Sequence, residues 1–405
     1  MWCGVLVAHV DVGIDRLFQP EFRSLVENKK VGLITNHTGI NARFESTLTI
    51  FERAHKDGIL RLTAVFAPEH GLYAAEGAGR YVEDQKTQTG IPIYSLHGVT
   101  RRPAQNVLKK LDVLVYDIQD IGCRSYTYTT TLFYAMEEAA KANLPVVVLD
   151  RPNPLGGTYV DGPVLEDSYR SFVGYVRVPY CHGMTVGELA RFFNGEYKVG
   201  CRLSVVPMNG WRRWMRFEST GLPWIPTSPN VPEVSTPWFY ATTGLIGELA
   251  CFCIGGGYFP FKILVTPWFD GKKMAKLLNR GIVEGVHFQP IRVKPRIGLY
   301  QGKLCDGVFL VVTDWTKYNP MQVLFALCDC IKQLYPEKLR EAFSNMKKRI
   351  SFFYSLVGTR AVHDILMNES EPFVSLCCLH RKEREAFLTC RRRYLLPCYS
   401  NFGTQ

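Results

Sequence analysis

The stretch DVLVYDIQD, from Asp112 to Asp120, decides the fold of this chain. Its apolar residues do not alternate strictly with polar ones, which is typical of a β-strand covered on both faces. A long helical pattern, YTTTLFYAMEEAAKANL, follows it, and the apolar run PVVVLDRPNP comes next. This order predicts two parallel strands joined by a crossover helix.

The same alternation extends along the chain in both directions. KVGLITN, RLTAVFAPE, IPIYSLHG and RLSVVPM have the length and composition of strands, and ESTLTIFERAHKDG, PAQNVLKKL and TVGELARFFNGEY have helical patterns. We therefore predict an α/β fold with a doubly wound parallel sheet. The segment Gly221 to Pro237 carries five prolines, and shorter strands and a helix-rich tail follow it. This change predicts an N-terminal domain at 12–222, a junction at 223–237 and a C-terminal auxiliary domain at 238–405.

Composition limits the class of protein. Hydrophobic residues make up 47% of the chain and charged residues 21%, which excludes a disordered protein. The net charge is +11, and much of the excess of basic over acidic residues lies between His380 and Pro397. We expect this segment to form a solvated helix face, because no zinc-finger, RRM-type or basic-zipper pattern accompanies it. Nucleic acid is therefore not an expected partner.

The cysteines and the N-terminus say little about the compartment. None of the thirteen cysteines belongs to a Cys-x-x-Cys pair, so we expect free thiols. The apolar residues from Met1 to Val10 fit either the remnant of an export signal, which places the protein in the periplasm or outside the cell, or a first strand of a cytoplasmic protein. No stretch is long enough for an integral membrane span.

Polar side chains follow four of the expected strands. In open α/β sheets, ligands bind outside the carboxyl ends of the strands, so four such groups at one edge predict a shared crevice. Each group taken alone is more typical of a helix cap or a turn than of a binding site. The groups are Asn36 with His37, Glu69 with His70, Asp117 with Gln119 and Asp120, and Asp150 with Arg151 and Asn153.

The residues at this edge favour carbohydrate chemistry. No Gly-x-Gly-x-x-Gly, Walker or Gly-x-Ser-x-Gly motif is present, so we expect neither a cofactor nor a nucleophilic serine. His37, His70 and His182 are candidate metal ligands without the spacing of a known metal motif, and we expect no metal. Carboxylates, amides, arginine and nearby aromatic residues are what a sugar site needs. Glycoside hydrolysis requires two carboxyl groups, for which Glu69 and either Asp117 or Asp120 are candidates.

Six blocks of sequence resemble the NamZ-type exo-β-N-acetylmuramidase family of bacteria. They are VGLITNHTG, FAPEHGL, DVLVYDIQDIGCRSYTY, VVLDRPNPLGG, HGMTVGELARFFN and GLPWIPTSPNVP, and the resemblance covers nearly the whole chain. It implies a Rossmann-like first domain, a smaller α+β auxiliary domain and an active cleft between them. It also implies a glycosidase that releases terminal N-acetylmuramic acid from peptidoglycan fragments. The Glu of the family's Pro-Glu-His-Gly motif is Glu69 in this chain.

These observations lead to an assignment of roles. We expect Glu69 to be the general acid, with a pKa raised by burial beside Phe66 and Ala67, and Asp120 or Asp117 to be the second carboxylate. His70 and Asn36 are expected to orient the acid, and Arg124 or Arg151 to grip the lactyl carboxylate with two hydrogen bonds. The substrate-binding candidates are Asn36, Arg124, Tyr126, Asp150, Arg151, Asn153, His182 and Asn230.

The chain departs from the family pattern in IGELACFCIGGGYFPFK. By ungapped counting, the expected Glu, Asn and Arg of the family fall on Gly247, Ala250 and Gly255, and only Glu248 offers a nearby carboxylate. Cys181 stands where an arginine is expected before HGMT. A catalytically inactive protein that binds muropeptides is therefore the alternative to an enzyme, and a metal-assisted hydrolase is a third hypothesis.

Overall fold

A computed structural model of the chain describes residues 9–74, 76–77, 79–249, 251–346 and 349–400. Its contacts divide these residues into two units. The first unit comprises residues up to 159, then 182–234, and then 388 onwards, and the second comprises 160–181 and 235–387. The division differs from the expected one in two places, because 160–181 joins the second unit and the C-terminal residues join the first.

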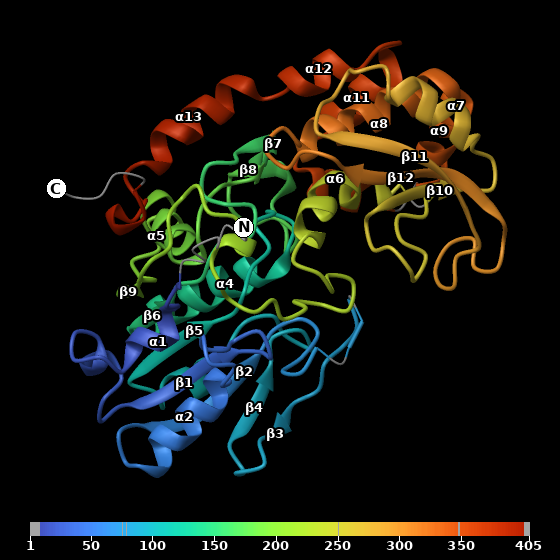
Figure 1. The fold of residues 1–405 in the computed structure, drawn as a ribbon. Coiled ribbons are helices and arrows are strands. Elements are labelled where there is room, and N and C mark those ends of the chain that lie inside the picture. Colours follow the sequence, from blue (N-terminus) through green and yellow to red (C-terminus); the bar gives the residue numbers. More distant parts are fainter. Residues whose placement is uncertain (1–8, 75, 78, 250, 347–348, 401–405) are drawn as a thin grey trace, which may run out of the picture. The chain divides into compact units, whose positions relative to one another are not determined.

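The first unit is built on a seven-stranded sheet in the order β3-β4-β2-β1-β5-β6-β9 (Figure 1). All neighbouring strands are parallel except β3 and β4. From β1 the chain adds β2 and β4 on one side and β5, β6 and β9 on the other, so the sheet is doubly wound, as predicted. The strands are β1 (Lys30–Thr35), β2 (Arg61–Ala67), β3 (Gln85–Lys86), β4 (Pro92–Ser95), β5 (Val113–Asp117), β6 (Val146–Leu149) and β9 (Leu203–Val206).

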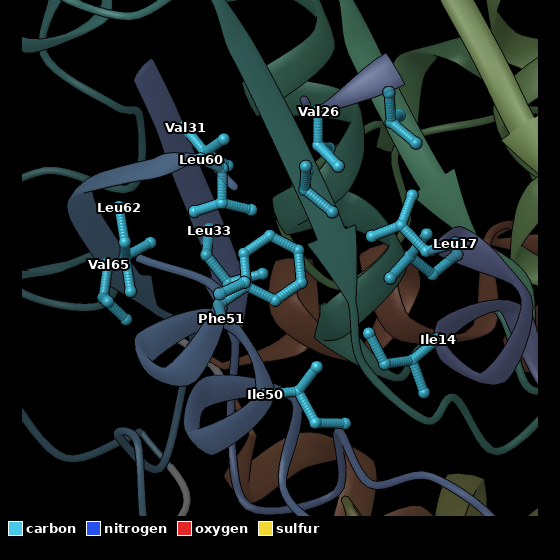
Figure 2. Close-up of a cluster of buried hydrophobic side chains, with 14 of the residues drawn as sticks. Ile14, Leu17, Val26, Val31, Leu33, Ile50, Phe51, Leu60, Leu62 and Val65 are labelled. Atoms are coloured by element: carbon cyan, nitrogen blue, oxygen red, sulfur yellow. The ribbon is translucent and has the colours of Figure 1, made fainter. Parts of the chain in front are cut away.

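Helices connect the parallel strands. The helices of this unit are α1 (Gly13–Leu17), α2 (Thr47–Lys56), α3 (Gln105–Leu108), α4 (Thr127–Lys141) and α5 (Val186–Glu196), with short 3-10 turns at Arg23–Leu25, Phe217–Ser219 and Pro397–Tyr399. The Ser46 hydroxyl caps α2 by accepting a hydrogen bond from the Thr49 backbone N–H at 3.0 Å. Phe51 of α2 lies beside Leu33 in the core (Figure 2), and Ile50 of the same helix is buried in the same cluster. Their burial attaches the helix to the sheet.

The second unit is α+β, as the resemblance implies. Its strands β10 (Ile263–Thr266), β11 (Val286–Val293) and β12 (Cys305–Val312) form an antiparallel sheet in the order β10-β12-β11, and β7 (Asp161–Val164) pairs with β8 (Pro179–Cys181). Its helices are α6 (Thr236–Gly247), α7 (Gly271–Leu278), α8 (Pro320–Leu334), α9 (Pro336–Asn345), α10 (Ile350–Val357), α11 (Ala361–Asn368), α12 (Phe373–Cys378) and the first part of α13 (Arg381–Arg391), with a 3-10 turn at Asp167–Tyr169. The residues of α13 from Leu388 onwards belong to the first unit. The Nδ2 atom of Asn319 donates to Asp161 at 3.3 Å, which helps to place the β7–β8 hairpin in this unit.

The expectations about the cysteines and about membrane-spanning segments can be compared with the described residues. All twelve cysteines among them are free thiols, as expected. No helix in this part of the chain has the length and hydrophobicity needed to cross a membrane. The residues Met1 to Ala8, which include most of the apolar N-terminal run, lie outside the described residues.

The C-terminal segment from residue 388 onwards packs into the first unit through specific polar contacts. The Tyr399 hydroxyl donates to Asp150 at 2.7 Å and accepts from the Met208 backbone N–H at 2.7 Å. The Tyr399 ring packs edge-on against Trp211, and both residues are fully buried. The same segment carries Arg391, which is only 8% exposed. The expectation that the basic C-terminal stretch is a solvated face is therefore wrong at Arg391.

We predict that Tyr399→Phe lowers the free energy of unfolding by about 1–3 kcal/mol, because it leaves the buried Met208 N–H without a partner and removes one of the hydrogen bonds to the buried Asp150. Urea denaturation measures the change. Tyr394→Phe is the matched control, since the Tyr394 hydroxyl contacts the more exposed Glu196. Its expected cost is below about 1 kcal/mol. Equal losses in the two variants would contradict this account of the C-terminal segment.

Candidate active site

The carboxyl ends of four neighbouring parallel strands place polar residues along one edge of the first unit's sheet. Asn36 follows β1, Glu69 follows β2, Asp120 follows β5 and Asp150 follows β6. The strand order reverses between β1 and β5, which is where open α/β sheets bind ligands. All four side chains are buried. The surroundings of each side chain decide what it can do.

The Glu69 carboxylate is held in its ionised form. It accepts hydrogen bonds from the Thr127 hydroxyl at 2.6 Å and from the Gly79 backbone N–H at 2.7 Å. Thr127 is the first residue of α4, so the carboxylate lies at a helix N-terminus, which favours negative charge. Burial raises the pKa of Glu69, but the two hydrogen bonds and the nearby His97 and His70 outweigh it and bring the pKa below its usual value. The expectation of a raised pKa for Glu69 is wrong.

Two histidines lie close to Glu69. His97 Nε2 is 3.8 Å from Glu69 Oε1, and burial lowers the pKa of His97 by more than the carboxylate raises it. The ring is therefore neutral at pH 7, and the hydrogen bonds from Thr127 and Gly79 do most to hold the charge on Glu69. Sequence reasoning did not select His97, although it follows β4 as Glu69 follows β2. His70, which did belong to the predicted set, adopts a positive φ of 70° and contacts the Glu76 carbonyl through Nδ1 at 2.8 Å.

Asp120 has the opposite character. Its Oδ2 accepts from the Gly122 backbone N–H at 2.7 Å, and its Oδ1 has no hydrogen-bond partner among the described residues. Burial raises the pKa of Asp120 to about 7, although backbone hydrogen bonds from Gly122 and Ile121 act to lower it. Near neutral pH this carboxyl group holds a proton for part of the time, as a general acid must. The sheet edge thus carries an ionised Glu69 and an Asp120 that is about half protonated near pH 7.

Buried polar atoms without partners accompany Asp120. Asn36 accepts hydrogen bonds from Thr38 through Oδ1, but its Nδ2 has none within the described part of the chain. His182 Nε2 is likewise unpartnered there and is 4.0 Å from Asp120 Oδ2. Buried polar groups are normally satisfied, so donors and acceptors left open together indicate a place for a polar ligand or water. This group of open atoms is the strongest structural sign of a binding site.

Asp117 and Arg151 are engaged with each other. Arg151 Nε donates to Asp117 Oδ1 at 2.5 Å and Nη2 donates to Oδ2 at 2.9 Å, while the Thr47 hydroxyl contacts the same carboxylate. Asp117 is completely buried, so it is placed to hold the sheet edge together rather than to contact a sugar. Arg151 Nη2 also donates to the Ile40 carbonyl at 2.7 Å, whereas Nη1 has no hydrogen bond to the described residues. A two-bond grip on a substrate carboxylate would therefore require this pair to break.

Most of the other predicted binding residues brace the site. Asp150 accepts from the Thr185 hydroxyl at 2.7 Å and the Gly187 backbone N–H at 2.8 Å, and so holds the N-terminus of α5. Burial raises its pKa to about 7. Asn153 donates to the Met184 carbonyl at 3.0 Å. These bonds fix the loops around the site and do not point to direct contact with substrate.

Tyr126 and His37 both contact the proline-rich segment. The Tyr126 hydroxyl donates to the Thr227 hydroxyl at 2.8 Å, and His37 Nε2 contacts the Pro226 carbonyl at 2.5 Å. The proline-rich segment is thereby attached to the sheet edge, and its residues up to 234 belong to the first unit. Arg124 is buried and is a source of positive charge near His182, and Asn230 is exposed.

A pocket opens at the same sheet edge. Ile40, Leu222 and Ile225 give it apolar walls, and Gln119 and Arg151 give it polar ones. All of these residues belong to the first unit.

Among the residues that the structure describes, no group of three or more His, Cys, Asp or Glu side chains is arranged to hold a metal ion.

The family departures lie in the second unit. A Cβ atom at Gly247 would come within 2.3 Å of the Ile254 side chain, so this backbone has no room for a larger residue unless Ile254 moves. Glu248 Oε2 is 3.3 Å from Arg349 and belongs to a partly exposed ion pair. Gly255 packs against Pro260. Ala250 lies outside the described residues.

We predict that Thr127→Val raises the pKa of Glu69, by roughly one unit, because the variant removes a hydrogen bond to the ionised form. If activity needs an ionised Glu69, the acidic limb of the pH–rate profile should then move to higher pH. Rates measured across the pH range give the size of the shift. Thr131→Val is the matched control on the same helix, since the Thr131 hydroxyl bonds to the Thr127 carbonyl. A shift of the same size in both variants would show that this bond does not set the pKa of Glu69.

Comparison with known proteins gives consistent results for both parts of the chain. The family model described as exo-beta-N-acetylmuramidase NamZ, N-terminal, matches residues 31–235, and the C-terminal model of the same description matches residues 238–396. The peptidoglycan beta-N-acetylmuramidase NamZ of Bacillus subtilis (strain 168) is 40% identical over 332 residues, which cover 81% of this chain and 78% of that protein.

Solved structures from Bacteroides fragilis NCTC 9343 have the same fold. One DUF1343 family protein is 37% identical with a TM-score of 0.87, and a second is 27% identical with a TM-score of 0.70. Each comparison covers 96% of this chain and 99% of the other.

Proposed function

Because the chain belongs to the NamZ family of exo-β-N-acetylmuramidases, we propose that it hydrolyses the glycosidic bond of a terminal N-acetylmuramic acid at the non-reducing end of peptidoglycan fragments. The structural observation that carries the proposal is the presence of carboxyl groups in unlike states after β2 and β5, at one edge of the sheet. Glu69 is held ionised, whereas Asp120 is about half protonated near pH 7. Glycoside hydrolysis needs one carboxyl group of each kind.

Asp120 is the general acid in this mechanism. Its proton passes to the glycosidic oxygen as the bond from that oxygen to the anomeric carbon breaks. The ionised Glu69 stabilises the positive charge that develops on the sugar ring and acts on the reacting carbon or on the attacking water. These roles reverse the expectation from sequence, in which Glu69 was the acid. Environment supports the reversal, since burial raises the pKa of Asp120, whereas at Glu69 the hydrogen bonds and the nearby histidines together outweigh burial and lower the pKa.

Groups with open hydrogen-bonding atoms bind the sugar in this proposal. Asn36 Nδ2 supplies a donor and His182 Nε2 lies beside Asp120. Arg151 keeps Nη1 for the lactyl carboxylate while Nε and Nη2 stay with Asp117 and Ile40. A single charge-assisted hydrogen bond therefore replaces the two-bond grip expected from sequence.

A second candidate function is binding without hydrolysis. The observation that favours it is the glycine at positions 247 and 255, where a Glu and an Arg are expected for the family. Assay of the purified protein on a chromogenic β-N-acetylmuramide separates the two functions. Release of the chromophore supports the enzyme, and saturable binding of muropeptide without release supports the binding protein.

We predict that Asp120→Asn lowers kcat/KM on the order of a hundredfold or more for a disaccharide fragment and much less for an activated phenol glycoside, because only the poor leaving group needs the proton. The basic limb of the wild-type pH–rate profile should lie near pH 7, where Asp120 loses its proton, and should be absent in the variant. Glu69→Gln should lower the rate strongly with both substrates.

Asp112→Asn serves as the control, because Asp112 lies at the amino end of β5 and accepts from the Lys30 backbone N–H. It should leave both rates within about twofold of wild type, as surface changes usually do. An equal loss with both substrates in Asp120→Asn would remove Asp120 from the role of acid.

A further inference from the structure

Arg391 is the last residue of α13 and lies in the C-terminal segment that packs into the first unit. Its Nη1 donates to three backbone carbonyls, those of Gly183 at 2.7 Å and of Gly157 and His182 at 3.3 Å. The side chain is only 8% exposed. Arg391 thus holds the backbone of the loop that carries His182, although the two residues are 209 positions apart in sequence.

The positive charge of Arg391 is buried without an ion-pair partner of its own. No salt bridge to Arg391 occurs among the described residues, and the nearby Glu188 forms a two-bond pair with Arg213 instead. Burial lowers the pKa of Arg391 to about 10, so the guanidinium remains charged at neutral pH. A charge kept in such a place acts on its neighbours over a short distance with little screening by solvent.

The ring of His182 is fixed in one orientation. Nδ1 accepts a hydrogen bond from the Met184 backbone N–H at 3.2 Å, so in the neutral ring the proton is on Nε2. Nε2 points toward Asp120 Oδ2 at 4.0 Å. This tautomer presents a donor, and not a base, to the carboxyl group.

We propose that Arg391 is a positioning residue, which fixes the loop that carries His182 and adds its charge to the burial that keeps the imidazole neutral, so that the proton of the pair stays on Asp120. This inference rests on the proposed role of Asp120 as the general acid. A protonated His182 would instead stabilise an ionised Asp120 as an ion pair, and the proton would be lost from the group that faces the glycosidic oxygen.

The charges around His182 agree with this role. The groups that face it are Asp120, Arg124 and Arg391, and burial together with the two arginines lowers the pKa of His182 to about 3. Arg391 is in turn influenced by Arg213, Glu188 and Arg392. Of the two arginines, Arg391 also holds the His182 carbonyl directly, so its removal should affect both the position and the charge of the ring.

NMR titration of isotope-labelled histidine in the full-length protein tests the proposal without depending on activity. The His182 signal is assigned by its loss in His182→Asn. In the wild type we expect a neutral ring with the proton on Nε2 from pH 8 down to about pH 4, well below the usual titration range of histidine. In Arg391→Gln we expect the pKa of His182 to rise by about one unit or more, because a nearby like charge is gone.

Two further variants separate charge from folding. Arg391→Lys keeps the charge and should keep His182 neutral, and Arg392→Gln removes the same charge from the exposed neighbouring residue and should leave the titration unchanged. In kinetics, the basic limb of the pH–rate profile should stay near pH 7 in Arg391→Gln, because His182 is still neutral there, and a fall in kcat that Arg391→Lys restores should report the lost hold on the His182 loop. A wild-type His182 that titrates near pH 6.5, or an unchanged titration in Arg391→Gln, would overturn the proposal, and the wild-type measurement remains decisive if a variant does not fold. If the protein proves to lack muramidase activity, the histidine titration still tests the effect of Arg391.

Discussion

A buried ion pair between Asp117 and Arg151 holds together the sheet edge on which the site depends. Asp117 ends β5 and Arg151 follows β6, and they share two hydrogen bonds of 2.5 and 2.9 Å. Arg151 also reaches the Ile40 carbonyl beyond β1, so one guanidinium connects the ends of three strands. Loss of either partner would leave an uncompensated buried charge, at a cost of about 3–5 kcal/mol. Asn36 and Asp120 lie in the loops that this pair fixes.

Similar carboxyl groups acquire different chemistry at this edge because their surroundings differ. Glu69 receives hydrogen bonds from a hydroxyl and a backbone amide at the start of α4, and these stabilise the anion. Asp120 is buried with one oxygen unpartnered among the described residues, and burial disfavours its charged form. The position of each side chain in the fold, more than its residue type, thus decides that Asp120 is the acid and Glu69 the anion.

Sequence reasoning could predict the parallel sheet and the strand ends because both depend on local patterns. Unbroken apolar runs such as Val113 to Tyr116 identify buried strands, and parallel strands necessarily end at one edge. The pKa of Glu69 could not be predicted in the same way, since it depends on Thr127, 58 residues away. The role of Arg391 depends on contacts across more than 200 residues, and a basic run gives no sign that one of its members is buried.

The central claim is that Asp120, and not Glu69, is the carboxyl group that holds a proton near neutral pH. Carbon-13 NMR titration of labelled aspartate and glutamate carboxyl groups in the wild-type protein tests it most directly, with signals assigned by Asp120→Asn and Glu69→Gln. The account predicts that Asp120 titrates near pH 7, while Glu69 stays ionised to below its usual pKa. A Glu69 that titrates near neutral pH beside an Asp120 that is already ionised at pH 5 would contradict it.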